Sequence, residues 1–512
     1  MHILAIIYLF VISLIFFPSL ALTNSYEEQG TYLADKNKAA LHSVYFCDEN
    51  NGWAAGYQGN VKTSDDTIND NVAYILKTTD GGKNWQDITP KKILEKGKWD
   101  LWMGERLYKV FFIDKDNGWV IGTHRTIAKT SDGGNSWSKI DFQAEEDRTK
   151  GHEVWRDIFI YQEEGAYKGF LVGGRYKDID YNYQDVDNEY EHEGFLYRYV
   201  DNNKKDNNKI ELTEVNVFKE KKYKHLTSLS ISLVNGHNDV WVTGYNYEGK
   251  NDVDNFGLIY LSDDGGVIWK EVSPKEKEHS GRDYTLACYN SIALSSYNAW
   301  VVGTNNTILF SSDYGNSWKN QSCEKKIPQE NFNKIFLVTN NLGYVAGSKG
   351  NLYLTLNGGE TWEKDKNISL KYCDKEFQGI YFPTLTKGWI VGEGEVEGKN
   401  ITILKYFQSE EIYSNQEKVV IYPNPFIPND YLEKTGSYNS GITIENLFPY
   451  SSVKIFTTSG EFVKELSLAD AYGRIIWKVD SSISSGLYLL AGKSKNNKKT
   501  LGKVVIIKYD YL

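Results

Sequence analysis

One eight-residue pattern, Ser/Thr-x-Asp-x-Gly-x-x-Trp, occurs five times in this chain of 512 residues and constrains its fold more than any other feature. The fifth copy has Asn in place of Asp. The pattern's acidic or amide residue and its Trp are, copy by copy, Asp80 and Trp85, Asp132 and Trp137, Asp264 and Trp269, Asp313 and Trp318, and Asn357 and Trp362. Recurrence at this strictness indicates an architecture built from repeated units.

Two further elements recur upstream of these copies. An aromatic-apolar-x-Gly segment occurs seven times, ending at Gly56, Gly122, Gly173, Gly244, Gly303, Gly347 and Gly392. An apolar-x-x-apolar-x-apolar segment precedes each, beginning at Leu41, Leu107, Trp155, Leu226, Tyr289, Phe332 and Phe377. These starts lie 43 to 71 residues apart, a spacing that suits four-stranded antiparallel blades with loop insertions. We therefore predict an all-β chain with a seven-bladed β-propeller over residues 22–407.

The seventh unit lacks a final strand after residues 401–406, and a segment around 30–34 is expected to supply it and close the ring. The fifth position of the first segment is often aromatic, as in Tyr45, Phe111, Phe159, Phe336 and Tyr381. Apolar residues on both faces of a strand predict that it is covered on both sides by stacked blades.

The repeated pattern itself is interpreted as a structural turn. Its Asp can accept backbone N–H bonds within the turn, its Gly supplies positive φ, and its Trp fixes the turn to the blade. A catalytic role for five equivalent positions is disfavoured, because one active site needs no such repetition.

Composition narrows the class of protein. Aromatic residues make up 14% of the chain and accompany 44 Gly, which favours strands and tight turns over helices. The net charge of −10 disfavours binding to nucleic acid, because phosphate binding requires a positive field.

The N-terminus predicts export. An apolar run at 3–17 and the small residues up to Ala21 predict a signal peptide over residues 1–21, with a retained membrane anchor as the alternative. No membrane span is expected after cleavage. Four cysteines, Cys47, Cys288, Cys323 and Cys373, would then lie in an oxidising space, where they allow three full pairings between which the sequence does not choose. A bridge between Cys323 and Cys373 is the first candidate, because they follow comparable points of neighbouring repeats.

The last hundred residues have a different character. The polar stretch 408–418 is predicted to be a linker, and six or seven short strand-like runs over 419–512 predict a small Ig-like β-sandwich. From residue 421 onward, 11 basic residues face 8 acidic ones, so this part is positive and the rest of the chain is negative.

The run Gly-Trp-x-x-Gly followed by Lys-Thr-x-Asp-Gly-Gly-x-x-Trp resembles the Asp-box (BNR) repeat propellers, and most of all the photosystem II assembly and stability factor family. The resemblance covers roughly residues 38–406 and implies an accessory binding protein without catalysis. Sialidases, sortilin-type receptors and xyloglucan-active glycosidases share the box, so the box alone does not fix the function.

The C-terminal segment resembles the type A sorting domain of the bacterial type IX secretion system. The matching pieces are Tyr422-Pro-Asn-Pro-Phe426, Val453–Phe456 with Gly460, Trp477, Ser485–Tyr488 and Gly502–Lys508. This resemblance implies that a secretion translocon reads residues 419–512 and that the protein is secreted or displayed on the outer cell surface. An Ig-like adhesive module without a sorting role is the alternative.

Candidate binding residues lie at the second and third positions of the seven first strands, where a propeller forms its central funnel. The candidate ligand-binding residues are Lys109, Arg156, Asp157 and Lys334 at these positions, and Arg106, which lies just ahead of them in the second unit. This ring predicts a polar or anionic ligand. The alternative is that the polar groups satisfy each other and water around the channel.

A weak candidate metal site lies in an acidic insertion of the third unit. Asp178, Asp180, Asn182 and Glu189 have the spacing of positions 1, 3, 5 and 12 of a calcium loop, but Tyr183 stands where Gly is expected. A solvated acidic loop is the alternative, and no other cofactor is expected.

Together these features predict a secreted, monomeric, non-catalytic propeller that binds a protein or glycan. The alternative is a secreted glycoside hydrolase of the sialidase or xyloglucanase type, which requires two carboxyl groups facing one cleft.

Overall fold

A computed structural model of the chain describes most of the repeat region and the strands of the C-terminal region. The described residues are 25–28, 39–58, 61–62, 68–69, 72–90, 106–140, 152–163, 165–176, 193–202, 210–217, 224–232, 238–247, 255–275, 287–295, 298–322, 330–373, 375–384, 386–396, 399–407, 419–422, 424–426, 441–445, 447, 452–466, 474–480, 482–493 and 499–507. Within them the chain is almost entirely β-structure, with a single short helix, α1 (Lys366–Lys371).

The repeat region forms four-stranded antiparallel sheets, seven of them among the described residues, which we name sheets I to VII. Sheet I holds β2 (Ala39–Phe46), β3 (Gly52–Gln58), β6 (Val72–Thr78) and β7 (Gln86–Asp87); sheet II holds β8 (Leu107–Phe112), β9 (Gly118–Gly122), β10 (Ile127–Thr130) and β11 (Ser138–Lys139). Sheet III holds β12 (His152–Glu163), β13 (Ala166–Tyr176), β14 (Glu193–Asp201) and β15 (Ile210–Val215); sheet IV holds β16 (Lys224–Ser232), β17 (Asp239–Tyr247), β18 (Asn255–Ser262) and β19 (Lys270–Glu271). Sheet V holds β20 (Tyr289–Ser295), β21 (Asn298–Gly303), β22 (Thr307–Ser311) and β23 (Lys319–Asn320); sheet VI holds β24 (Phe332–Leu337), β25 (Gly343–Gly347), β26 (Leu352–Thr355) and β27 (Glu363–Lys364). Sheet VII holds β28 (Glu376–Tyr381), β29 (Lys387–Val396), β30 (Lys399–Phe407) and β1 (Ser25–Glu28), and a small hairpin of β4 (Val61–Lys62) and β5 (Ile68–Asn69) extends from sheet I.

The sheets pack in a cycle, as a β-propeller requires. The first strand of each sheet contacts the first strand of the next, and β28 contacts β2. A separate hydrophobic cluster fills each interface between successive sheets, including the one between sheets VII and I. The apolar surface of both faces of each sheet is thereby removed from water, which is the main favourable contribution to folding.

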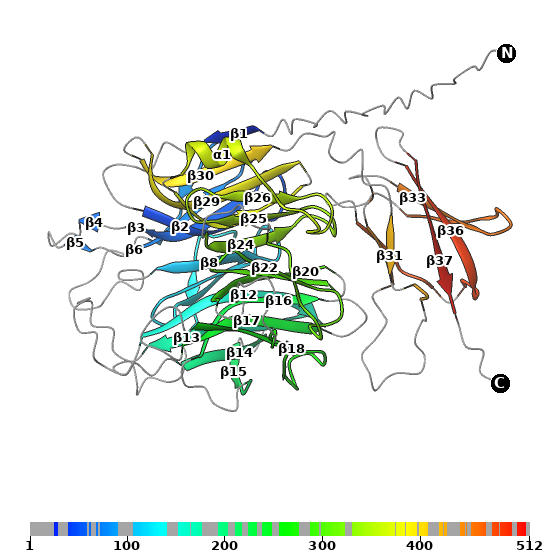
Figure 1. The fold of residues 1–512 in the computed structure, drawn as a ribbon, viewed down its shortest axis with the longest axis horizontal. Coiled ribbons are helices and arrows are strands. Elements are labelled where there is room, and N and C mark those ends of the chain that lie inside the picture. The colour runs from blue at the N-terminus through cyan, green and yellow to red at the C-terminus, as the bar shows by residue number, and fades with distance from the viewer. Residues whose placement is uncertain are drawn as a thin grey trace, which may run out of the picture.

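The ring closes through a strand from the N-terminal side of the chain. Strand β1 pairs antiparallel with β30, placing Ser25 opposite Phe407, so the blue and yellow strands lie side by side in Figure 1. The predicted closing segment at 30–34 was therefore misplaced by a few residues, and it lies outside the described residues.

Every first strand carries a β-bulge at the same place. If the strand is numbered from its first apolar residue, positions 1 and 3 pair with successive residues of the second strand and position 2 is extra. Position 1 always faces the Gly of the aromatic-apolar-x-Gly segment. A Cβ on Gly244 would lie 1.7 Å from the carbonyl oxygen of His225, and a Cβ on Gly122 would lie 2.2 Å from that of Arg106. Only glycine lets the two backbones approach this closely.

Aromatic stacking joins neighbouring sheets. At three interfaces the aromatic residue of the second strand stacks on a Phe at position 6 of the next unit: Trp53 on Phe112 at 3.6 Å between ring centroids, Trp389 on Phe46 at 3.8 Å and Tyr344 on Phe382 at 4.2 Å. The indole N–H of Trp53 also donates to the carbonyl of Gly133 in the turn of sheet II.

The repeated turns share one hydrogen-bond scheme. In each of the five, the Ser or Thr hydroxyl donates to the Asp or Asn Oδ1 at 2.6–3.0 Å and accepts from the backbone N–H of the second Gly at 2.7–2.9 Å. In sheet II the Asp132 carboxylate also accepts from the backbone N–H and the hydroxyl of Ser136. Both glycines of this turn have positive φ.

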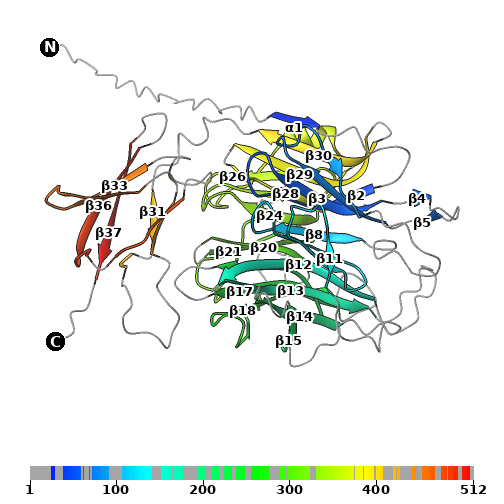
Figure 2. The same cartoon turned by 180° about the vertical axis from the view of Figure 1, so that it is seen from behind.

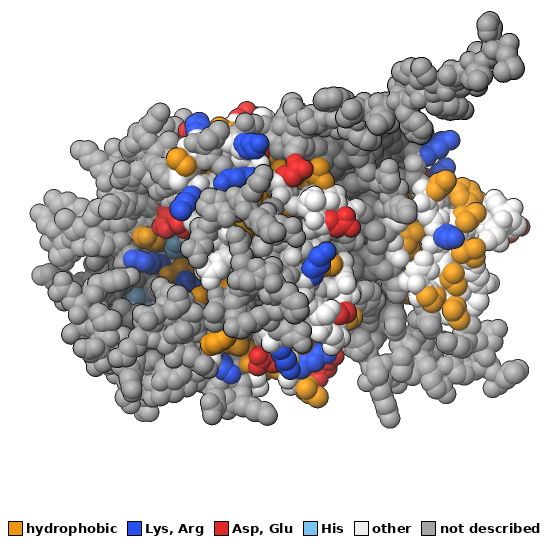
Figure 3. Space-filling model, viewed as in Figure 1, with side chains coloured by type: hydrophobic (Ala, Val, Ile, Leu, Met, Phe, Trp, Pro, Cys, Tyr) orange, Lys and Arg blue, Asp and Glu red, His pale blue; other side chains and the backbone are white. Residues whose placement is uncertain are grey.

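The C-terminal strands form a separate group, seen from both sides in Figures 1 and 2. One sheet holds β31 (Val420–Tyr422), β32 (Ile442–Glu445) and β35 (Ile475–Trp477); the other holds β34 (Phe462–Leu466), β33 (Ser452–Thr457), β36 (Gly486–Lys493) and β37 (Lys499–Ile506). The two share one hydrophobic cluster around the fully buried Trp477. Figure 3 shows hydrophobic side chains gathered on the surface of this group. Leu489 on β36 and Leu501 on β37 are exposed.

Several predictions from the sequence fall outside the described residues: the signal peptide at 1–21, the linker at 408–418 and Cys323. The expected Cys323–Cys373 bridge therefore stays a prediction, and among its two residues only Cys373, which is exposed, is described. Within the described part of the chain no helix has the length and apolar character needed to cross a bilayer.

Replacing Asp132 by Ala is expected to lower the free energy of unfolding by about 1–3 kcal/mol, because the backbone N–H of Ser136 and the hydroxyl of Thr130 lose their acceptor. Asp132→Asn is the matched control, since Asn357 makes the equivalent bonds in sheet VI. Urea unfolding followed by Trp fluorescence measures both. Equal losses in the two variants would contradict this account of the turn.

Candidate functional site: the central cavity

The bulge directs the polar side chains of position 2 toward the next sheet. Four of them donate to the position-1 carbonyl of the next first strand and so join successive sheets. His42 donates from Nδ1 to Leu107 at 2.9 Å, and Asn290 donates to Phe332 at 2.8 Å. Thr227 and Asn333 make the equivalent bonds to Tyr289 and Phe377. At these four positions the predicted polar ring is a set of hydrogen bonds between sheets.

Position 2 of sheets II and III is occupied by a stack of rings and a cation. The Tyr108 ring lies parallel to His42 at 4.8 Å between centroids, and the Arg156 guanidinium lies over Tyr108 at 4.2 Å. Arg106 lies over the ring of Tyr57, at 4.6 Å. Burial, helped by the positive charges of Arg156 and Arg106, lowers the pKa of His42 to about 4 in spite of its hydrogen bond to Leu107. The imidazole is therefore neutral at pH 7.

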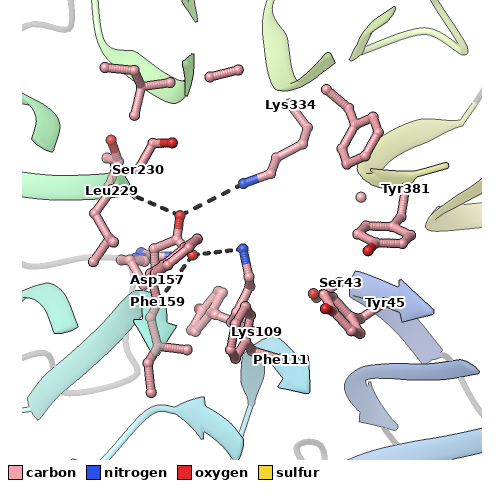
Figure 4. A pocket seen from close by; sticks show the side chains of 18 of the residues that line it. Ser43, Tyr45, Lys109, Phe111, Asp157, Phe159, Leu229, Ser230, Lys334 and Tyr381 are labelled. Atoms are coloured by element: carbon pink, nitrogen blue, oxygen red, sulfur yellow. Dashed lines mark hydrogen bonds and ion pairs between the residues drawn. The ribbon is translucent and has the colours of Figure 1, made fainter. Parts of the chain in front are cut away.

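Position 3 supplies an ion cluster that spans the channel. Asp157 on β12 lies with its Oδ1 2.7 Å from the Nζ of Lys109 on β8, and its Oδ2 lies 3.8 Å from the Nζ of Lys334 on β24. Ser228 and the backbone N–H of Leu229 also donate to Oδ2. Figure 4 shows the two ammonium groups directed at this carboxylate from different sides of the channel.

Burial and charge act in opposite directions on this cluster. Burial alone would raise the pKa of Asp157, but the two lysines and the hydrogen bond from Ser228 hold it below its usual range. Burial and the neighbouring Lys109 lower the pKa of Lys334 to about 8, although Asp157 opposes this effect. The carboxylate is therefore ionised at neutral pH and cannot act as a proton donor there.

The cavity around this cluster has a volume of about 910 Å³ and is lined by all seven first strands. Position 5 contributes a ring of side chains to its wall: Tyr45, Phe111, Phe159, Ser230, Ala293, Phe336 and Tyr381. Neighbouring aromatic members lie 4.7–5.5 Å apart between centroids. Each of these aromatic residues also packs against a hydrophobic cluster between two sheets, as the sequence predicted. The sequence did not predict that the same residues line the central channel.

The structure brings together four of the five candidate ligand-binding residues. Lys109, Arg156, Asp157 and Lys334 line the cavity, whereas Arg106 lies beside it on Tyr57. The sequence pattern placed Tyr108 and His42 in the polar ring but did not show that their rings support Arg156. The shared position 2 of neighbouring repeats was the signal that could have revealed them.

The candidate calcium residues Asp178, Asp180, Asn182 and Glu189 lie outside the described residues. Over the described part of the chain, no group of three or more His, Cys, Asp or Glu side chains is arranged to hold a metal ion. The Asp-box residues, Asp80 to Trp362, lie in the turns between the third and fourth strands of their sheets and not in the cavity.

Fold and cavity define this chain as a β-propeller protein. A family model described as photosynthesis system II assembly factor YCF48 matches residues 94–166, which hold sheet II and strand β12. No curated protein matches the chain.

Similar solved structures include YCF48 bound to D1 peptide, with 16% identity over 76% of this chain and 96% of that one and a TM-score of 0.47. YCF48 from Cyanidioschyzon merolae has 14% identity over 75% and 98% of the two chains and a TM-score of 0.46. PorZ, a surface component of the type IX secretion system of Porphyromonas gingivalis, has 14% identity over 91% and 59% and a TM-score of 0.46.

His42→Asn is expected to reduce the acid sensitivity of folding, because Asn290 and Asn333 make the same bond between sheets without a titrating ring. The pKa of His42 is about 4 when folded and about 6.5 when unfolded. The wild type therefore loses up to about 3 kcal/mol of stability as pH falls from 6.5 to 4, and the variant does not. Urea unfolding at pH 7 and pH 4.5 tests this difference. A variant with unchanged pH dependence would contradict it.

Proposed function

We propose that this protein is a non-catalytic binding propeller that holds a protein or glycan partner in its central cavity, with an anionic group of the partner beside Arg156. One observation carries the proposal. Arg156 is stacked on Tyr108 and lines the cavity together with Lys109 and Lys334, and these three cations are accompanied by a single carboxylate among the described lining residues. A guanidinium held flat on a ring has little conformational freedom to lose on binding a carboxylate, sulfate or phosphate.

The arrangement of the cluster argues against the glycoside hydrolase alternative. Glycoside hydrolysis generally uses two carboxyl groups, one of which must carry a proton. Asp157 is held ionised by Lys109 and Lys334, and no second carboxylate lines the cavity in the described part of the chain. The family model match over residues 94–166 includes Lys109, Arg156 and Asp157 and is consistent with a binding role.

The wider organisation is part of the same proposal. Sheets I to VII are the seven blades of one propeller, and residues 419–512 are an Ig-like sorting domain read by a secretion translocon. A signal peptide over residues 1–21 starts export, and the mature monomer is secreted or held at the outer cell surface. The two sheets around Trp477 and the motifs from Tyr422 to Lys508 support this assignment.

Binding is tested with a panel of acidic peptides and of sialylated and sulfated glycans, using the mature chain and its variants. Arg156→Ala is expected to weaken binding of the best probe by about 10-fold or more, because a charge-assisted hydrogen bond is lost. Lys270→Ala, on the exposed edge of sheet IV, is the matched control and should bind like the wild type. Equal binding by all three proteins would refute this cavity as the binding site, and glycoside turnover lost in Asp157→Ala would favour the enzyme.

Export is tested by expression in a bacterium that has a type IX system, followed by fractionation and N-terminal sequencing. We expect the chain outside the cell with a new N-terminus after Ala21, and retention inside the cell when residues 419–512 are deleted. Full-length chain in the cytoplasm would contradict the proposed export. The propeller without residues 419–512 should retain its Trp fluorescence, which separates loss of export from loss of folding.

A further inference from the structure

We propose that Lys334 is a carbonyl-reactive amine and that the central cavity captures aldehydes as an imine on its Nζ. The inference concerns a different chemistry from the partner binding proposed above and does not depend on it. It rests on the number of charges in the ion cluster, on the position of Lys334 in the cavity, and on the groups around its amine.

The Asp157 carboxylate lies much closer to one of its two lysines than to the other. Its Oδ1 lies 2.7 Å from Lys109, whereas Lys334 lies 3.8 Å from Oδ2. Oδ2 already accepts hydrogen bonds from Ser228 at 2.8 Å and from Leu229 at 3.2 Å. Asp157 itself is 3% exposed. Lys109 therefore holds the ion pair, and the second ammonium is left with a long contact and a like charge beside it.

The Lys334 ammonium lies in a cavity with more cations than anions, and this surplus of positive charge favours the neutral form of its amine. The charged or titratable side chains that line the cavity with Lys334 are, strand by strand, His42 and Tyr45 on β2, Tyr108 and Lys109 on β8, Arg156, Asp157 and Tyr161 on β12, His225 on β16, Tyr245 on β17 and Tyr381 on β28. Only Asp157 is negative among them, because a tyrosine is neutral at pH 7. The pKa of Lys334, about 8, agrees with this count. A lysine that is partly neutral at physiological pH is a nucleophile.

The amine is accessible from the cavity. The Lys334 side chain is 25% exposed, and it faces a space of about 910 Å³. Figure 4 shows its Nζ directed toward Asp157, with Tyr381 and Tyr45 on the side away from that carboxylate. These rings belong to the apolar wall at position 5 and suit the body of an aromatic or aliphatic aldehyde, while Arg156 suits an anionic substituent.

The cluster contains the groups that imine formation needs. The neutral Nζ of Lys334 adds to the carbonyl carbon, and a proton passes from nitrogen to oxygen to give a carbinolamine. Lys109 gives a proton to the departing hydroxyl group, which leaves as water, and the C=N bond forms as an iminium. The iminium nitrogen then returns its proton to Lys109. Overall, one amine and one aldehyde give one imine and one water. Asp157 is placed to stabilise the iminium charge.

The test uses the full chain and pyridoxal 5′-phosphate, with neutral benzaldehyde as a second probe, followed by borohydride reduction and peptide mass spectrometry. At pH 7.5, Lys334 is expected to be labelled at least about 10-fold faster than Lys270, because the Lys334 amine is enclosed beside a second ammonium, whereas Lys270 lies in solvent and pairs with Asp263. The labelling rate of Lys334 should rise with a midpoint near pH 8.

Two variants separate the proposal from simple accessibility. Lys334→Arg keeps the charge and should abolish the fast site with unchanged Trp fluorescence. Lys109→Met removes the neighbouring ammonium and should move the labelling midpoint of Lys334 upward by about one pH unit. Labelling of Lys334 no faster than that of Lys270, or a midpoint that Lys109→Met leaves unchanged in a folded protein, would overturn the proposal. A ratio of the pyridoxal 5′-phosphate rate to the benzaldehyde rate that falls in Arg156→Ala would further place the phosphate near Arg156, and an unchanged ratio would show that Arg156 does not contact the phosphate.

Discussion

The close crossing of two backbones at the start of every sheet is the constraint on which the rest of the structure depends. A bulge in the first strand passes over a glycine of the second strand, where any Cβ would meet a carbonyl oxygen at about 2 Å. The extra residue of the bulge is turned toward the next sheet, as His42 and Asn290 show. One local feature therefore provides both the joints between sheets and the inward direction of the residues that follow.

The candidate site arises where this repeated plan is varied. Sheets I, IV, V and VI use position 2 for a hydrogen bond to the next strand, whereas sheets II and III place Tyr108 and Arg156 there, in a stack of rings. At position 3, the charged residues of sheets II, III and VI meet in one cluster. A repeated scaffold can hold a single site, because the remaining sheets supply the hydrogen bonds that connect successive sheets.

Local charge in the cavity differs from the charge of the whole chain. The net charge of −10 describes the surface as a whole, whereas the described cavity wall carries Lys109, Arg156 and Lys334 against Asp157. Walls of low dielectric strengthen these interactions and change the proton affinities of Lys334 and His42. The chemistry available to this protein therefore depends on a small set of enclosed charges.

The sequence by itself determined the all-β class, the repeated four-stranded units, the turn chemistry of Asp132 and its equivalents, and the positions that converge on the channel. These features are local, because they depend on hydrogen bonds and periodicity within one unit. It did not show that Tyr45 and Phe111 face the channel, that Ser25–Glu28 closes the ring, or that Lys334 reaches Asp157. Only the tertiary structure decided these points, because closing the ring brings together residues far apart in the chain and sets their distances, burial and proton affinities.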